Sequence, residues 1–293
     1  MTMHSSSPPA RPTRPEAQGR RPGTGVSRGL AVVLGLLATS AASLNAVIQN
    51  QAQITVTFLV LLAFFAYSRR FWIIAGVILG LAAALKLSPA FLGLLFLRDR
   101  NWRAIGAMAL TGGALLLLSV LLAGLEAHRV WLARLDVLDR MSILSMINYS
   151  PEMLLYQLQH WLTGAPGKGM GYDSPLWVQL LPKALLLFGL FVIGLRRNLP
   201  MPVALLALST LVALLGPLSW MHYFLLPMML FPALFLRFEA QRAWALIALG
   251  GVILSFPLYV KLRGFQQPLL MSALVPTLYF CALTVALLIP RKT

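Results

Sequence analysis

Lys86 is the residue whose type and place most clearly suggest chemistry, because it lies in the middle of a long apolar stretch at 71–97. A charged side chain in such a position costs about 2.5–3.5 kcal/mol on insertion scales, so it usually faces a cavity or a partner group. Its ammonium group could hold a phosphate as a point charge. The alternative is that the long side chain snorkels to the membrane interface. The residue type and its position leave both interpretations open.

Four other polar or aromatic residues are candidates for substrate binding. His222 lies beside Trp220 and could orient a sugar hydroxyl, contact a phosphate or move a proton, although an interfacial aromatic belt is the more common meaning of this pattern. Asn148 stands in a segment that is typical of a turn followed by a helix start. Gln51 belongs to a polar cluster at 49–53, which is either a solvated turn or a wall of hydrogen-bonding groups for a polar substrate.

Two acidic residues, Asp136 and Asp139, have a spacing that could hold a divalent cation, but the signal is weak. A solvated helix face paired with Arg134 and Arg140 is the favoured interpretation. The sequence contains no HExxH, CxxC, P-loop or GxSxG pattern. We therefore predict neither a metal site nor a cofactor.

The elements that position these residues are predicted to be membrane helices. Of 293 residues, 59% are hydrophobic and only 11% are charged, whereas about 25% are charged in soluble domains. Apolar runs such as 30–47, 104–123 and 269–289 are long enough to span a bilayer as helices. The net charge of +16 sits at the ends of these runs, which is typical of orientation signals and not of a nucleic-acid groove. The predicted fold is all-α, a polytopic membrane protein of about ten helices, some of them short and broken.

The chain divides into a disordered cytoplasmic tail at 1–28 and a transmembrane domain at 29–293 with an extracytoplasmic loop at about 125–176. Basic residues concentrate on one side of this arrangement, which predicts a multi-pass protein of the cell (inner or plasma) membrane with both termini in the cytoplasm. We place membrane segments near 29–48, 53–67, 71–97, 105–124, 177–195, 201–216, 218–236, 243–260 and 269–289.

Two of these segments are expected to be broken. The stretch 71–97 has basic clusters at both ends and Pro89 at its middle, so we predict two short helices that meet at Lys86 to Pro89 and start from the same side. The stretch 201–236 is expected to break similarly at 216–220. Broken helices are tolerated where they line a cavity walled by protein. This arrangement places the cluster at 49–53, Lys86, the loop and His222 on the same outer side.

These segments together resemble glycosyltransferase family 87, whose members are membrane enzymes of the GT-C type. The resemblance covers about residues 45–240 and rests on Gln51-Ala52-Gln53, the glycine-rich run that ends in Lys86-Leu87-Ser88-Pro89, the basic turn at 97–103, Asn148-Tyr149-Ser150, and Gly216 to His222. It implies a hexosyltransferase that moves a sugar, mannose in this family, from a polyprenyl-phosphate donor to an extracytoplasmic glycan or glycolipid acceptor. By this resemblance Lys86 would bind the donor phosphate, while Gln51, Asn148, Trp220 and His222 would line the substrate site.

The resemblance also implies inversion at the anomeric carbon with a carboxylate as general base. In the family this acid comes from a loop that precedes the glutamine-containing helix, and this chain is expected to lack that N-terminal part. We therefore assign no catalytic residue. The alternatives are a truncated, non-catalytic membrane subunit and a small-molecule or lipid transporter. The breaks at Pro89 and Pro217 are not embedded in similar sequence, which weighs against the paired halves of a transporter.

Overall fold

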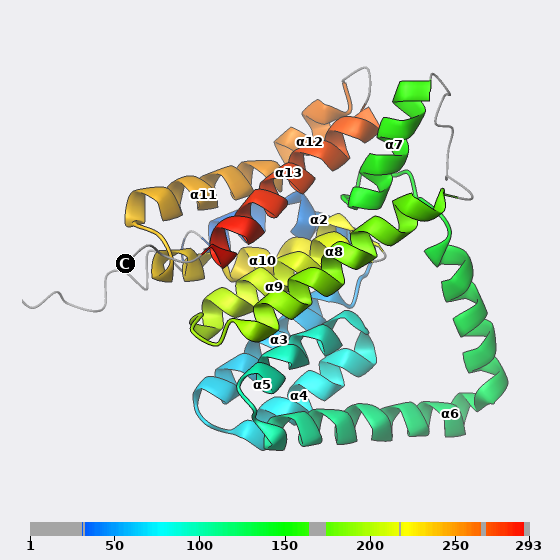
Figure 1. The fold of residues 1–293 in the computed structure, drawn as a ribbon, viewed down its shortest axis with the longest axis vertical. Coiled ribbons are helices and arrows are strands. Elements are labelled where there is room, and N and C mark those ends of the chain that lie inside the picture. The colour runs from blue at the N-terminus through cyan, green and yellow to red at the C-terminus, as the bar shows by residue number, and fades with distance from the viewer. Residues whose placement is uncertain (1–30, 32, 164–173, 217, 265–267, 290–293) are drawn as a thin grey trace, which may run out of the picture.

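The computed structural model describes residues 31, 33–163, 174–216, 218–264 and 268–289 (Figure 1). Nearly all of them are helical, and the described part contains no strand, only two isolated β-bridges that join Ser40 to Ser255 and Asn148 to Trp220. The all-α prediction is therefore confirmed for these residues. The predicted tail at 1–28 lies outside them.

Three described helices are long and apolar enough to cross a membrane: α6 (Trp102–Asp139), α8 (Leu176–Leu195) and Leu269–Leu288 of α13 (Pro268–Leu288). A fourth span is possible if α2 (Ala41–Ile48) and α3 (Gln53–Ser68), which meet at 118°, count as one bent crossing. The helices α4 (Trp72–Leu85), α9 (Met201–Leu215) and α11 (Ala240–Ile253) are apolar but shorter. These lengths support a membrane protein, whereas the number of about ten spans stays a prediction.

The first predicted segment, 29–48, is interrupted at Ser40 and is not one continuous helix. Helical residues 33–39 precede the break, Ser40 is extended with φ −79° and ψ 139°, and α2 begins at the next residue. The Ser40 hydroxyl oxygen accepts a hydrogen bond from the backbone N–H of Ser43 and so caps α2. The backbone N–H of Ala41 donates to the carbonyl of Leu254, which ties the break to the far end of the chain.

The stretch 71–97 is broken where Pro89 predicts it. Helix α4 ends at Leu85, Lys86 is extended, and the chain continues as the 3₁₀ helix η1 (Ser88–Gly93) and the short helix α5 (Leu94–Arg98). The ring of Tyr67 lies 4.8 Å from the ring of Trp72 and 4.8 Å from the ring of Phe96. Because one side chain contacts both the start of α4 and the end of α5, the chain has turned back and both ends lie together.

Helix α4 packs closely on the first half of α6 through glycines. A Cβ atom on Gly76 would lie 2.2 Å from the carbonyl oxygen of Ala104, and one on Gly80 would lie 2.7 Å from that of Met108. Small residues at four-residue spacing let two helix backbones approach in this way. The contact fixes the direction of α4, and therefore the position of Lys86 at its end.

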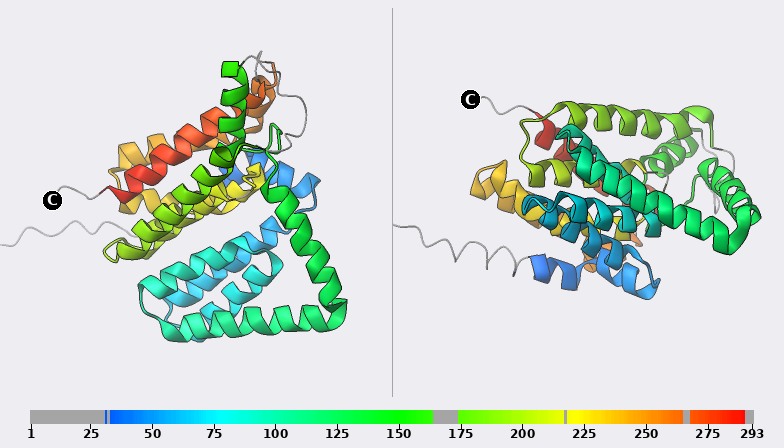
Figure 2. Two further views of the ribbon diagram at one scale, coloured as in Figure 1. Left: turned by 45° about the vertical axis from the view of Figure 1, so that its right-hand side comes forward. Right: turned by 90° about the horizontal axis from the view of Figure 1, so that it is seen from below.

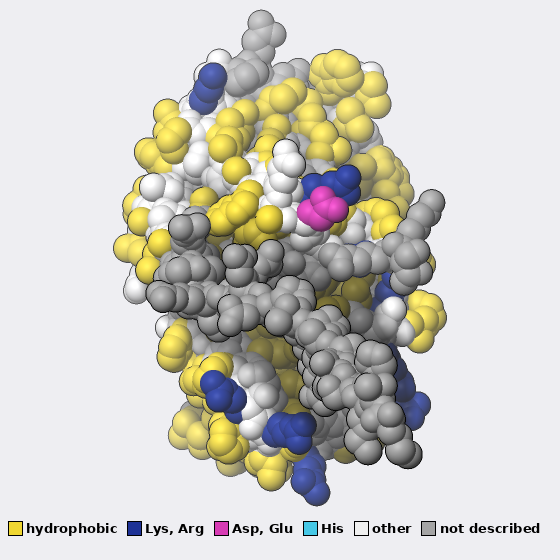
Figure 3. Space-filling model, turned by 90° about the vertical axis from the view of Figure 1, so that its left-hand side faces the viewer, with side chains coloured by type: hydrophobic (Ala, Val, Ile, Leu, Met, Phe, Trp, Pro, Cys, Tyr) yellow, Lys and Arg dark blue, Asp and Glu magenta, His cyan; other side chains and the backbone are white. Residues whose placement is uncertain are grey.

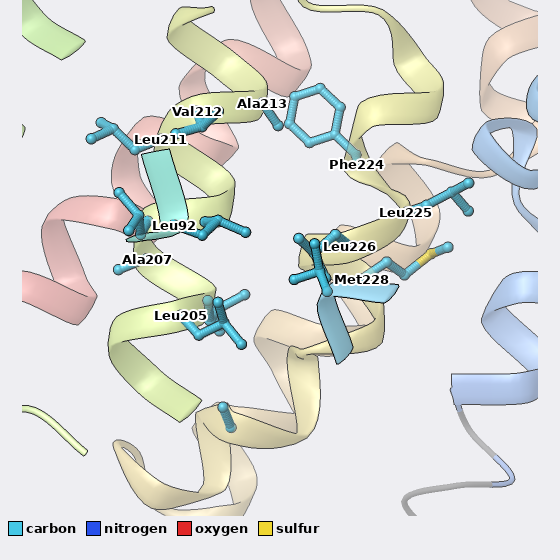
Figure 4. Close-up of a cluster of buried hydrophobic side chains, with 14 of the residues drawn as sticks. Leu92, Leu205, Ala207, Leu211, Val212, Ala213, Phe224, Leu225, Leu226 and Met228 are labelled. Carbon is cyan, nitrogen blue, oxygen red and sulfur yellow. The ribbon is translucent and has the colours of Figure 1, made fainter. Parts of the chain in front are cut away.

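The core of the molecule surrounds α9, which is buried on every side from Val203 to Leu215. A helix that is apolar all round is expected to be central. Its side chains pack against η1 and against the chain that follows it, as Figure 4 shows for Leu92, Leu211, Phe224 and Met228. That following stretch, predicted as a second helix, is instead a series of three short pieces: η2 (Met221–Phe224), α10 (Leu225–Met229) and η3 (Phe231–Leu236).

Helix α6 extends well past the predicted membrane segment and bends at Gly124, where φ is 82° and ψ is 156°. Its second half belongs to the predicted extracytoplasmic loop, which also contains α7 (Pro151–Thr163). Figures 1 and 2 show α6 as a bent arm that frames one side of the molecule. The glycine- and proline-containing stretch at 164–167 lies outside the described residues. Helix α12 (Phe256–Leu262) links α11 to α13.

Candidate functional site

Lys86 occupies the break between α4 and η1, and its ammonium group points to neutral partners. Nζ donates a hydrogen bond to Oε1 of Gln53 over 2.8 Å. It also lies 3.5 Å from the centroid of the Tyr223 ring, which is a cation–π contact. The residue is half-buried. The site is therefore built from three segments, the end of α4, the first residue of α3 and the 3₁₀ helix η2.

No carboxylate neutralises this cation within the part of the chain that the structure describes. The four ion pairs there join Arg98 to Asp99, Arg129 to Glu126, Arg140 to Asp136 and Lys183 to Asp139. An amide oxygen and a ring face stabilise an ammonium group without cancelling its charge. Lys86 thus keeps a net positive charge and two further N–H donors, which suits the binding of an anion.

His222 lies next to this site and is almost fully buried, with 1% of its surface exposed. Its Nδ1 is 2.9 Å from Oδ1 of Asn45, and its ring centroid is 4.9 Å from that of Tyr223. The helix α2 therefore supports η2 through a direct side-chain contact. Tyr223 in turn connects His222 to Lys86.

Trp220 and Asn148 are brought together by an antiparallel β-bridge. The backbone N–H of Tyr149 donates to the carbonyl of Ser219 over 2.7 Å, and that of Met221 donates to the carbonyl of Ile147 over 2.7 Å. The side chain of Asn148 is used within its own loop, because Nδ2 donates to the carbonyl of Ile143 and Oδ1 accepts from the N–H of Ser150. The geometry gives Asn148 a loop-shaping role, and a direct contact with substrate stays a prediction.

Gln51 is half-buried in the turn between α2 and α3, where its backbone N–H donates to the carbonyl of Ala46 over 2.9 Å. Its predicted substrate contact stays a prediction. The residue that meets Lys86 is Gln53, two positions further on, which is buried and also donates through Nε2 to the hydroxyl of Thr57 over 3.4 Å. The polar cluster at 49–53 thus contributes to the site through its last member.

Two spaces adjoin Lys86. A groove of about 590 Å³, here called the Lys86 groove, runs between the α4–η1 break and the bent arm of α6; it is mostly apolar, with Lys86, Ser119 and His128 as its polar members. Small residues provide its room, among them Ala83, Ala90, Ala109 and Gly112. The second space lies at the partners of Lys86: Gln53 and Tyr223, together with Ser88, line a cavity of about 30 Å³, which is enough for a water molecule.

Two acidic residues of the predicted outer loop form ion pairs away from Lys86. Asp136 accepts from Arg140 over 2.8 Å, and Asp139 accepts from Lys183 over 2.6 Å, so each carboxylate has its own cation. Among the described residues no three His, Cys, Asp or Glu side chains gather as metal ligands.

Glu152 is a buried acid in the first turn of α7, and its carboxylate accepts a hydrogen bond from Ser142 over 3.1 Å. The hydroxyl of Ser142 also contacts that of Ser174, at the start of the segment leading into α8. Burial raises the pKa of the Glu152 carboxyl to about 7, against the lowering effects of Ser142 and Lys183. The acid therefore connects the end of α6, α7 and α8, and no contact joins it to Lys86 or His222 in the described structure.

The sequence singled out Lys86, His222, Trp220 and Asn148 as candidates, but it did not indicate Asn45 and Tyr223 as the partners of His222 and Lys86. Tyr223 was visible as the aromatic neighbour of His222. Asn45 carries one available signal, since it is the one amide in a mostly apolar helix whose sequence is AASLNAVI. A polar side chain in such a position usually seeks a partner across helices.

Comparison with known proteins shows the family of the chain. The polyprenol-phosphate-mannose-dependent alpha-(1-2)-phosphatidylinositol pentamannoside mannosyltransferase of Mycolicibacterium smegmatis is 30% identical over 222 residues, which are 72% of this chain and 50% of that protein. The chain thus matches about half the length of that relative. No solved structure matches the chain. The family model of Glycosyltransferase family 87 matches residues 11–222, which include Lys86 and His222. The chain therefore belongs to glycosyltransferase family 87.

Proposed function

We propose that this protein is a membrane mannosyltransferase that moves mannose from a polyprenyl-phosphate donor to a glycan or glycolipid acceptor on the extracytoplasmic side. The family and the mannosyltransferase relative support the class of reaction and the kind of donor. The observation that carries the proposal is the uncompensated ammonium group of Lys86, held at the break between α4 and η1 beside an apolar groove.

The proposed sugar transfer needs a cation beside the phosphate of the donor. In the transfer, the bond between the anomeric carbon of mannose and the phosphate oxygen breaks, and the acceptor oxygen forms the new bond to that carbon. The lipid phosphate leaves with an additional negative charge, which a preorganised positive group stabilises more in the transition state than in the ground state. Lys86 is preorganised for this role because Gln53 and Tyr223 hold its ammonium group in place. The base that takes the acceptor proton is not assigned.

The Lys86 groove suits the lipid part of the donor. An isoprenoid chain is apolar and needs a surface that opens toward the bilayer, and the groove is lined mostly by Ala, Leu, Met and Gly side chains. Lys86 forms part of the lining, so a phosphate bound there has its hydrocarbon chain beside α4 and α6. We expect His222 and Trp220, which stand in and next to η2, to lie on the sugar side of the donor.

The decisive experiment is sugar transfer by the purified protein in lipid nanodiscs, with a radiolabelled polyprenyl-phosphate mannose and a phosphatidylinositol mannoside acceptor. We expect Lys86→Ala to lower kcat by about 10²–10³-fold, the usual loss when one transition-state donor is removed. Lys261→Ala, which removes an exposed lysine on α12, is the matched control and should transfer at the wild-type rate.

Two outcomes would contradict the proposal in different ways. If the wild-type protein releases no mannose from the donor, the chain is better described as the non-catalytic subunit or the transporter, and uptake of donor into vesicles separates those two. If transfer occurs but Lys86→Ala leaves it unchanged, the reaction class stands and the phosphate is bound elsewhere.

A further inference from the structure

A second cationic site lies at the opposite end of the helices from Lys86. Arg100 lies in the turn between α5 and α6, Trp102 is the first residue of α6, and Arg197 follows the end of α8. Together with the apolar faces of α5 and α8 these residues line a groove of about 420 Å³, here called the arginine groove. Its apolar wall contains Leu94, Leu97, Leu190, Phe191 and Leu195.

The cations of this groove are not neutralised by the acid beside them. Asp99 accepts a hydrogen bond from Nε of Arg98 over 3.0 Å and another from the hydroxyl of Tyr67 over 3.1 Å. Arg98 is buried and also donates to the carbonyl of Leu199, so this pair is structural. Arg100 and Arg197 are exposed and belong to none of the ion pairs within the described residues.

The backbone conformation at Arg100 makes glycine a suitable replacement for testing its side chain. Its φ is 55°, in the left-handed region, and its N–H donates to Leu97 while the next N–H donates to Phe96. This is the helix-ending motif in which glycine is the usual residue, because an L side chain there adds strain. Helix α3 ends in the same motif at Arg70, where φ is 64°, but Arg70 does not line the arginine groove.

The surroundings are those of a membrane interface. Trp102 is 66% exposed at the rim, as aromatic residues are where lipid headgroups meet hydrocarbon. Figure 3, which looks onto this end of the molecule, shows Lys and Arg side chains in several places with hydrophobic side chains between them. Basic pockets between membrane helices bind anionic lipid headgroups, whose acyl chains need the apolar wall below.

We propose that the arginine groove binds one anionic diacyl phospholipid, with its phosphate between Arg100 and Arg197 and an acyl chain along α5 and α8. Two cations without a carboxylate, above an apolar wall and beside an exposed tryptophan, match an anionic headgroup with its chain and do not match a neutral lipid. The site is separate from the Lys86 groove, and it does not depend on the proposed transfer reaction.

The test is native mass spectrometry of the detergent-purified protein with phosphatidylglycerol or with phosphatidylcholine of the same acyl chains. We expect phosphatidylglycerol to stay bound to the wild type. Arg100→Gly and Arg197→Gln should each weaken its retention about fivefold, and the double variant should show further loss. Arg70→Gly is the matched control, because it changes the same kind of turn outside the groove and should retain the lipid as the wild type does.

Arg100→Gly should not destabilise the fold, because glycine adopts the left-handed backbone conformation without strain. Without added lipid this variant should melt no lower than the wild type, so a loss of lipid retention is not due to unfolding. Equal retention of the two lipids by the wild type would overturn the proposal, because it indicates an unspecific lipid shell. Equal loss in Arg70→Gly and Arg100→Gly would also overturn it, because it indicates a diffuse surface charge. Sugar transfer is not the readout, so these outcomes stay distinct from a failure of the proposed function.

Discussion

At the scale of single residues, the ammonium group of Lys86 is held by a π-face and an amide, which leave its charge free for a ligand. The ring of Tyr223 attracts the ammonium group of Lys86, whose Nζ lies 3.5 Å from the ring centroid. Such a cation–π contact contributes about 0.5–2 kcal/mol, and it is stronger where water is excluded. Tyr223 also contacts the His222 ring. Tyr223 therefore contacts both predicted site residues, Lys86 and His222.

We expect Tyr223→Leu to lower kcat/KM for the polyprenyl-phosphate donor by about 3–30-fold, because leucine fills similar space without a quadrupole. Tyr223→Phe keeps the ring and should stay within about twofold of the wild type. Steady-state transfer kinetics at varied donor concentration measure both. If the leucine and phenylalanine variants lose the same amount, the hydroxyl or the packing matters and the cation–π contact does not.

Glu152 should make the stability of the fold depend on pH. Burial raises the pKa of its carboxyl from an ordinary 4.5 to about 7, so the folded chain binds a proton more tightly than the unfolded chain between these two values. The stability of the protein must then fall as the pH rises through this window, and the contribution becomes constant above about pH 7.

We expect Glu152→Gln to remove this contribution, because glutamine stays neutral at every pH. The melting temperature of the wild type, measured from pH 5 to pH 8, should fall relative to that of Glu152→Gln. Glu126→Gln is the control, because the Glu126 side chain is 79% exposed. This substitution should leave the dependence of melting temperature on pH as it is in the wild type. A constant difference between wild type and Glu152→Gln over this range would show that the acid is ionised throughout.

Residue types alone identified Lys86 and His222, but not what they touch. Lys86 meets a residue 33 positions away and His222 one 177 positions away. Contacts at such separations depend on how helices pack, which a single sequence does not state. The choice of Gln51 over Gln53 shows the same limit, since both are amides in one polar turn and only the fold decides which of them faces the lysine.

At the scale of elements, the break after α4 was predictable because proline removes a donor and restricts the residue before it. The bend of α6 at Gly124 falls where the predicted membrane segment 105–124 ends, but the continuation of the helix to Asp139 was not predicted, because the stretch after Gly124 was expected to be part of a polar loop. The break at Ser40 could not be predicted from the local sequence, because it is fixed by pairing with Ser255, far along the chain. Local chemistry predicted the first of these features, and tertiary contacts determine the last.

The Lys86 groove depends on two elements, and its use can be tested on α6. Gly112 lines the groove, and a Cβ there would meet no atom within 4 Å, so a large side chain has room to enter. We expect Gly112→Phe to raise KM at least about tenfold for a long-chain polyprenyl-phosphate mannose. A donor with a short isoprenoid chain should be used almost normally, because it needs less of the groove.

Gly113→Phe is the matched control. Gly113 is the next residue, also has no atom within 4 Å of an added Cβ, and does not line the groove. It should leave both donors unaffected. If Gly112→Phe impairs the short-chain and long-chain donors equally, the groove does not hold the lipid, and the substitution acts on the position of Lys86 or on the fold.

At the scale of the whole molecule, the charged turns and the candidate site lie at opposite ends of the helices. The connections α3–α4, α8–α9 and η3–α11 lie to the left in Figure 1, while the break after α4 and the arm of α6 lie to the right. The basic turns at 69–70, 98–103 and 196–197 belong to the left end. The positive-inside rule then predicts that the Lys86 end faces away from the cytoplasm.

This orientation can be read by cysteine labelling on intact cells with a membrane-impermeant maleimide. The native Cys281 is exposed, so it is first replaced by serine. Gln49 and Arg103 are both exposed, and they lie in the turn before α3 and in the first turn of α6. We expect Gln49→Cys to be labelled on intact cells, and Arg103→Cys to be labelled only after the membrane is opened, because headgroups and bilayer separate the two ends.

The cysteine-free chain is the control for background labelling, and opened cells show that both positions react. The reverse pattern would place the lysine, the histidine and the Lys86 groove on the cytoplasmic side. The uncompensated charge of Lys86 would remain, but the proposed transfer on the extracytoplasmic side would be wrong. The expected pattern instead joins three independent facts, the basic turns, the broken helix and the apolar groove, into one orientation in which the donor reaches the cation from the outer leaflet.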